Sequence, residues 1–122
     1  MEFIKQSDIV VFSNSGVESH QLLFPENSKS TRITITKVDV AVGATNGRHH
    51  HAQSEQVWVA LAGCATLLLA GDSTQVFRAG DVARFEPGDT HGLTNTGSEI
   101  FTYLSVTSPP TNFRAAYDRE WR

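Results

Sequence analysis

The stretch that decides the fold is "GRHHHAQSEQVWVALAG", which runs from Gly47 to Gly63. Three consecutive histidines look like an affinity tag, but a tag stands at a chain end, whereas these lie mid-chain before an apolar run. In an extended chain, side chains two residues apart point to the same face. His49 and His51 can therefore converge on one ion, while His50 points to the other face.

A second stretch, "GDVARFEPGDTHGLTN", carries His91 at the start of a predicted strand. Imidazole is a ligand for zinc, copper, iron and nickel. Three histidines that meet inside a narrow barrel cost free energy unless a metal ion or a hydrogen-bond network satisfies them. His49, His51 and His91 are therefore candidates for a metal site, with a hydrogen-bond network as the alternative, whereas His20 is interpreted as a surface or hydrogen-bonded histidine.

Short apolar segments separated by turn-forming residues run through most of the chain. The turns include "PENSKS", "AGDS", "EPGD" and "NTGS". This pattern predicts an all-β sandwich or barrel, with strands at 8–13, 19–24, 32–42, 56–62, 65–69, 74–78, 82–85, 91–95 and 100–108. Within 32–42 the apolar positions change parity between Ile35 and Val38, which predicts a β-bulge near Thr36 or Lys37.

The C-terminal segment "TNFRAAYDREWR" is the part of the chain with a helical pattern. It follows a Pro-Pro pair, and Phe113, Ala116, Tyr117 and Trp121 form one apolar stripe at helical spacing. We expect a short helix over about residues 112–121 that covers one end of the barrel. A dimer contact is the alternative role for the stripe.

Composition limits the function classes. The 122 residues predict a single domain over 1–122. A net charge of −3 without a basic cluster argues against nucleic acid as a partner. The first residues, "MEFIKQSDIV", do not resemble a signal peptide, and no apolar run is long enough to span a bilayer. One cysteine allows no internal disulfide, so we expect a cytoplasmic protein.

Two groups of residues resemble the two motifs of the cupin family. The first group is Gly43, His49, His51, Glu55 or Gln56, and Gly63, and the second is Gly80, Gly88, His91 and Asn95. One departure is Glu86, which stands where the second motif has proline. The resemblance implies a cupin double-stranded β-helix, a conical jelly-roll-like barrel with its core at about 32–108. It also implies one divalent transition metal per chain (Zn, Ni, Mn or Fe) near the open end, and we expect a homodimer.

The fourth ligand implied by this resemblance is either Glu55 or Gln56. If three residues separate the ligand from His51, the motif places Glu55, whereas if six residues separate it from Gly63, the motif places Gln56. The loop after His51 varies in length more easily than the strand that ends at Gly63 changes register. We therefore predict that Gln56 faces the metal and that Glu55 faces outward, with the reverse arrangement as the alternative.

The resemblance implies a small-molecule ligand or substrate, and three functions remain open. The first is Lewis-acid isomerase, lyase or cyclase chemistry on a small oxygenated molecule, such as a sugar acid, keto or polyketide-like compound. The others are an iron-dependent dioxygenase and a non-catalytic binding module. A neutral glutamine ligand favours the first, because it leaves more net positive charge on the metal. Small cupins that open uronate rings carry an acid on the last strand, where this chain has Ser105.

Five residues are candidates for catalysis or for substrate binding beside the metal. Glu55 and His50 are candidate general bases. Arg84 and Tyr103 are candidates for holding an anionic substrate, as is Arg48, because a guanidinium pairs with a carboxylate in a fork. A solvated surface position is the alternative for each arginine.

Overall fold

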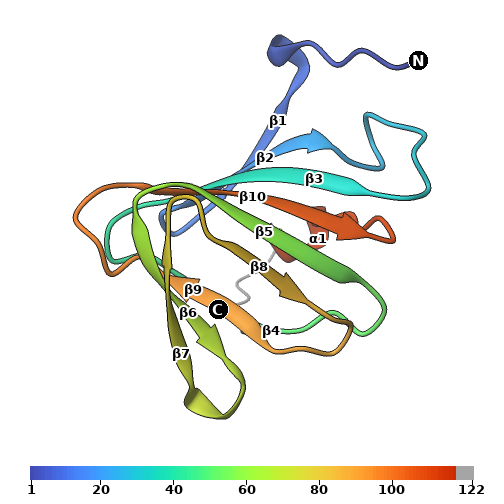
Figure 1. Ribbon diagram of the computed structural model, residues 1–122. Coiled ribbons are helices and arrows are strands. Elements are labelled where there is room, and N and C mark those ends of the chain that lie inside the picture. The colour runs from blue at the N-terminus through green and yellow to red at the C-terminus, as the bar shows by residue number, and fades with distance from the viewer. Residues whose placement is uncertain (118–122) are drawn as a thin grey trace.

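The computed structural model describes residues 1–117, and its strands form two facing sheets (Figure 1). One sheet has six strands in the order β1-β2-β3-β10-β5-β8, and the other has four in the order β4-β9-β6-β7. The strands are β1 Val10–Asn14, β2 Val17–Leu23, β3 Thr34–Val40, β4 Thr45–His49, β5 Glu55–Ala62, β6 Cys64–Leu69, β7 Thr74–Arg78, β8 Val82–Phe85, β9 His91–Thr94 and β10 Phe101–Ser108. Single-turn 3₁₀ helices lie at Gln6–Asp8 and Ala70–Asp72. The predicted all-β fold is confirmed.

The apolar core lies between the two sheets, toward the end of the barrel at which β3 and β10 pair through Val40 and Phe101. Leu67, Phe77 and Leu93 from the small sheet pack with Phe101 from the large sheet, and all four side chains are almost fully buried. Trp58 belongs to the same cluster. The other end of the barrel is lined by polar side chains, and the functional site is found there.

The N-terminal hairpin belongs to the barrel. β2 pairs with β3 in antiparallel fashion, and β1 pairs with β2. The large sheet therefore begins at Val10, before the predicted barrel core of about 32–108. Its inward residues include Ser19 and Gln21, which are buried.

The predicted β-bulge in β3 is wrong. Burial alternates without interruption from Thr34 through Thr36 to Val40, and the residues between them are half-buried on the opposite face. The irregularity lies on β2 instead, because Gln21 pairs with Thr36 whereas Leu23 pairs with Ile35. The parity change in the sequence arises because the inner face is polar at Thr34 and Thr36 and apolar further along the strand.

Strand β4 was not among the predicted strands, because its sequence, "TNGRH", has no apolar residue. It pairs with β9, and the register shifts between Asn46 and His49. Its backbone passes so close to Gly92 that a Cβ there would lie 2.7 Å from the Asn46 carbonyl oxygen. A glycine at position 92 therefore allows β4 to approach β9 next to the histidines.

Helix α1 spans Arg114–Tyr117, and the rest of the helix predicted over 112–121, including Trp121, lies outside the described residues. The Arg114 guanidinium donates hydrogen bonds to the Glu26 carboxylate, at 2.5 and 2.7 Å. The Tyr117 hydroxyl is hydrogen-bonded to the Ser19 hydroxyl. These contacts attach the end of the described chain to the N-terminal hairpin. Within residues 1–117, no helix has the length and apolar character needed to cross a membrane.

Candidate metal centre and its cavity

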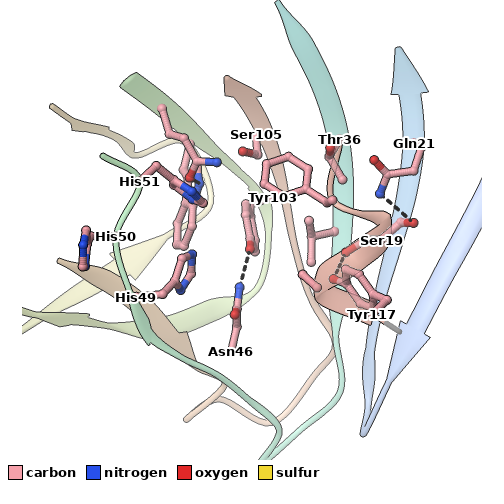
Figure 2. A pocket seen from close by; sticks show the side chains of 15 residues that line it. Ser19, Gln21, Thr36, Asn46, His49, His50, His51, Tyr103, Ser105 and Tyr117 are labelled. Carbon is pink, nitrogen blue, oxygen red and sulfur yellow. Dashed lines mark hydrogen bonds between the residues drawn. The ribbon is translucent and has the colours of Figure 1, made fainter. Parts of the chain in front are cut away.

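Three histidines converge at one end of the barrel. His49 ends β4 and His91 begins β9, and the two residues are direct partners in the antiparallel pairing. His51 follows in the next loop, and one ring nitrogen from each of the three lies within 4.8 Å of the others. His50, between them, lies on the other side of the chain (Figure 2). The predicted alternation of the three consecutive histidines is therefore confirmed.

Backbone carbonyl groups orient two of the rings. The Nδ1–H of His49 donates to the Gly47 carbonyl at 2.7 Å, and that of His91 donates to the Asp89 carbonyl at 2.9 Å. In this tautomer Nε2 of each ring carries the lone pair that a metal ion needs. Burial lowers the pKa of His51 and of His91 to about 4, and it lowers the pKa of His49 as well. All three rings are therefore neutral at pH 7.

The residues fit a divalent transition metal. Nε2 of His51 and Nε2 of His91 are buried and have no hydrogen-bond partner within residues 1–117. A buried ring nitrogen without a partner costs free energy, which a metal ion would offset. Three neutral imidazoles are a donor set for zinc, nickel, iron or copper.

Glu55 and Gln56 face opposite sides of β5. Gln56 lines the cavity and is 4% exposed, with its Nε2 donating to the Thr107 hydroxyl at 2.9 Å. The Trp58 indole donates to Gln56 Oε1 at 3.1 Å, which directs the amide oxygen and leaves it a second lone pair. Glu55 forms an ion pair with Arg84 on the outer face, at 2.5 Å. The predicted facing of both residues is confirmed, while metal ligation by Gln56 stays a prediction.

A cavity of about 320 Å³ lies beside the histidines (Figure 2). Such a volume is near the lower end of the range for small-molecule sites, about 300–1,000 Å³. None of the described residues that line it is Asp, Glu, Lys or Arg. They are Ser19, Gln21, Thr36, Val38, Asn46, His49, His50, His51, Gln56, Trp58, Tyr103, Ser105, Phe113, Ala116 and Tyr117.

The candidate catalytic residues separate into two groups. Tyr103 is buried in the cavity, where its hydroxyl accepts a hydrogen bond from Asn46 Nδ2 at 3.3 Å, and exposed His50 lies at the rim. Glu55 and Arg84 pair with each other away from the cavity, so the structure gives neither of them contact with a ligand there. Arg48 also lies outside, where its Nε donates to the Leu69 carbonyl at 2.8 Å.

Sequence reasoning missed the polar residues on the large sheet. Gln21, Thr36 and Ser105 are buried, face the cavity and belong to three adjacent strands. The available signal was the presence of polar residues at alternate positions, the first and third in "SHQ" and in "TIT". Residues at such positions share one face of a strand, which is therefore polar. Their more apolar neighbours, such as Ile35, misdirected the assignment of the inner face.

Asn95 closes the turn after β9. Its side-chain amide donates to the carbonyl groups of Val40 and Glu99, at 2.9 and 2.8 Å, and its Oδ1 accepts from the Gly97 backbone at 2.9 Å. It is 1% exposed and does not line the cavity. Asn95 therefore has a structural role in this turn.

Residues 36–107 match the model of the cupin domain, and the chain belongs to this family. All three histidines and Gln56 lie inside the matched segment. A comparison with curated protein sequences finds no match.

Solved structures resemble this fold at low sequence identity. The ectoine synthase of P. lautus has a TM-score of 0.80 at 14% identity, covering 98% of this chain and 86% of its own. A predicted oxalate decarboxylase from Thermotoga maritima has a TM-score of 0.76 at 23% identity, covering 88% and 98%. The polyketide cyclase RemF from Streptomyces resistomycificus has a TM-score of 0.73 at 18% identity, covering 88% and 79%. At these identities the similarity defines the fold alone.

Proposed function

We propose that this protein is a metal-dependent cupin enzyme that acts on a small oxygenated molecule by isomerase, lyase or cyclase chemistry. The observation that carries the proposal is the cavity of about 320 Å³ beside three neutral, convergent histidines. The similar structures include a polyketide cyclase and an ectoine synthase, which supports chemistry on small molecules.

His49, His51 and His91 would hold the metal, with Gln56 as the fourth protein ligand. A divalent ion held by uncharged ligands keeps its full positive charge and supplies Lewis acidity toward a carbonyl or hydroxyl oxygen. The lining of the cavity contains no carboxylate among the described residues, so no protein anion there offsets that charge.

Tyr103 is the residue best placed to assist the chemistry. Burial raises the pKa of its hydroxyl, so the group stays protonated at neutral pH. Because that oxygen accepts from Asn46, its own proton is available to a substrate oxygen that gains negative charge. His50, at the rim, is the titratable group that would exchange protons between the substrate and solvent.

A non-catalytic binding module is the second candidate. The same absence of a carboxylate among the described lining residues favours it, because general bases in enzymes are often Asp or Glu. In that case the metal and the cavity would hold a ligand without converting it.

The test is turnover by protein reconstituted with zinc, nickel, manganese or iron(II), without oxygen, on sugar acids, β-diketones and hydroxyketones. We expect conversion with at least one metal, and a Tyr103→Phe variant should lose activity while it keeps the metal. Binding without conversion for every metal would favour the binding module. Turnover that needs iron(II) and consumes oxygen would identify a dioxygenase instead.

A further inference from the structure

The cavity wall opposite the histidines carries a row of polar side chains across three neighbouring strands. Gln21 on β2 pairs directly with Thr36 on β3, and Thr36 pairs directly with Ser105 on β10. All three side chains are at least nine-tenths buried, with exposed fractions of 0%, 5% and 5%. Figure 2 shows Thr36 and Gln21 on the far side of Tyr103 from His49 and His51, with Ser105 next to Tyr103. The inner face of a β-sandwich usually carries apolar side chains at such positions.

Several buried oxygens around this wall lack a partner in the described part of the chain. Within residues 1–117, Gln21 Oε1, Thr36 Oγ1 and Asn46 Oδ1 accept no hydrogen bond, and each belongs to a residue that lines the cavity. The amide nitrogens of the two amide side chains are already used, since Gln21 Nε2 donates to the Ser19 carbonyl and Asn46 Nδ2 donates to Tyr103. The two amides therefore leave acceptor oxygens for a ligand.

The hydrogen-bonding capacity of these side chains restricts which ligands can bind. An amide oxygen only accepts, so the ligand has to bring hydrogen-bond donors. The threonine and serine hydroxyls both donate and accept, which matches hydroxyl groups of a ligand. No described lining residue is a carboxylate that would pair with an ammonium group. Buried polar groups that pair only with a ligand also disfavour analogues without hydrogen-bond donors. When such an analogue binds, the buried oxygens of the protein stay unpaired.

We propose that Gln21, Thr36 and Ser105 form a hydroxyl-binding subsite for a substrate whose opposite end is held by the metal centre. This inference rests on the proposed function and narrows it to molecules that combine a metal-chelating hydroxy-acid or hydroxy-ketone end with a tail bearing hydroxyl groups.

Two commercially available six-carbon acids separate the contributions that the chelating end and the hydroxylated tail of the ligand make to binding. Gluconate and 2-hydroxyhexanoate share the chelating 2-hydroxy-acid end and the chain length, but only gluconate carries hydroxyl groups along the tail. Calorimetric titration of the metal-loaded protein should give tighter binding of gluconate, by roughly tenfold or more. A Thr36→Val variant, which keeps the side-chain shape, should reduce this preference about three- to tenfold. Thr66→Val removes a hydroxyl that bonds to Thr96 on the outer surface, and it should leave the preference unchanged.

Thermal unfolding of the metal-loaded, ligand-free protein gives a second measurement. Because Thr36 Oγ1 has no partner within the described chain, Thr36→Val should unfold at or above the parental melting temperature. A clearly lower melting temperature would mean that the hydroxyl is structurally satisfied, and the subsite would be refuted.

The remaining outcomes separate this inference from the proposed function. If both acids bind equally and Thr36→Val changes neither affinity, the polar row holds only water and the subsite is refuted. The proposed function would be unaffected by that result. Loss of the metal during purification of the parental protein would instead contradict the proposed function. Failure of both acids to bind to metal-loaded protein would overturn the assignment of a hydroxylated, chelating substrate.

Discussion

Glu55 and Gln56 are consecutive residues on β5, yet one forms an ion pair on the outer face and the other is buried beside the histidines. This arrangement places a neutral amide beside the histidines, where the adjacent position would have brought a carboxylate. The charge at the candidate metal centre therefore depends on the register of a single strand.

We predict that Gln56→Ala weakens metal binding by roughly tenfold or more, since it removes a ligand and the partner of Trp58. Glu55→Ala is the matched control, and it should change metal affinity little, because Glu55 forms an exposed ion pair with Arg84 away from the histidines. Competition with a chelator measures both. Metal loss in the Glu55 variant alone would reverse the assignment.

Gln56→Glu should bind metal more tightly than the parental protein, because a carboxylate adds an attractive charge. The same charge makes the ion a weaker Lewis acid, so we expect lower turnover by the metal-loaded variant. Parallel metal titrations and rate measurements would test the pair of effects. An increase in both would contradict the role we give to the neutral ligand.

The double variant His49→Ala, His51→Ala should not retain a divalent metal. The parental protein should carry close to one ion per chain, measured by elemental analysis. Because an ion bound to the folded state alone stabilises it, added metal should raise the parental melting temperature but not that of the variant. Full metal retention by the variant would exclude the three-histidine centre.

Gly92→Ala should weaken metal binding although residue 92 is not a ligand. The added Cβ would meet backbone atoms of β4 at 2.7 to 2.9 Å, so that β4 and His49 have to move. Gly97→Ala is a control with a comparable clash, 2.5 Å from the Cys64 carbonyl oxygen, on residues that do not line the cavity. We expect both variants to lower the melting temperature and only Gly92→Ala to lower metal affinity.

The stability of the metal-free protein should decrease as the pH falls from about 6.5 to about 4. Burial depresses the pKa of His51 and His91 from 6.5 to about 4 in the folded state. In that window the unfolded chain binds more protons than the folded chain, so acid favours unfolding. Denaturant titrations in the presence of a chelator would measure the slope, and His91→Asn should reduce it. A flat profile would contradict burial of neutral rings.

The sequence was sufficient to predict the arrangement at the end of the barrel that carries the histidines, because the reasons for that arrangement are local. Alternation along an extended chain assigns His49 and His51 to one face and His50 to the other. The facing of Gln56 follows from counting back from Gly63, a residue with positive φ whose position tolerates little change, since a Cβ there would lie 3.0 Å from the Ile100 carbonyl oxygen.

The opposite wall could not be predicted by the same means. Inside a barrel with a ligand cavity, the inner face is partly polar, so the usual rule that apolar residues mark the inside fails at Thr34 and Thr36. Strand β4 lacks apolar residues for a related reason, because its inward side chains, Asn46 and His49, line the cavity. The pairing of Glu55 with Arg84 depends on β5 and β8 being neighbours, which is tertiary information.

The match to the family covers residues 36–107 and so includes every candidate metal ligand, but it leaves out both segments that close the cavity around the ligand. Ser19 and Gln21 come before it, and Phe113 and Tyr117 follow it. The terminal segments therefore add walls to the cavity without adding a candidate metal ligand. Divergence in these segments alone can reshape part of the cavity while the histidine cluster stays as it is.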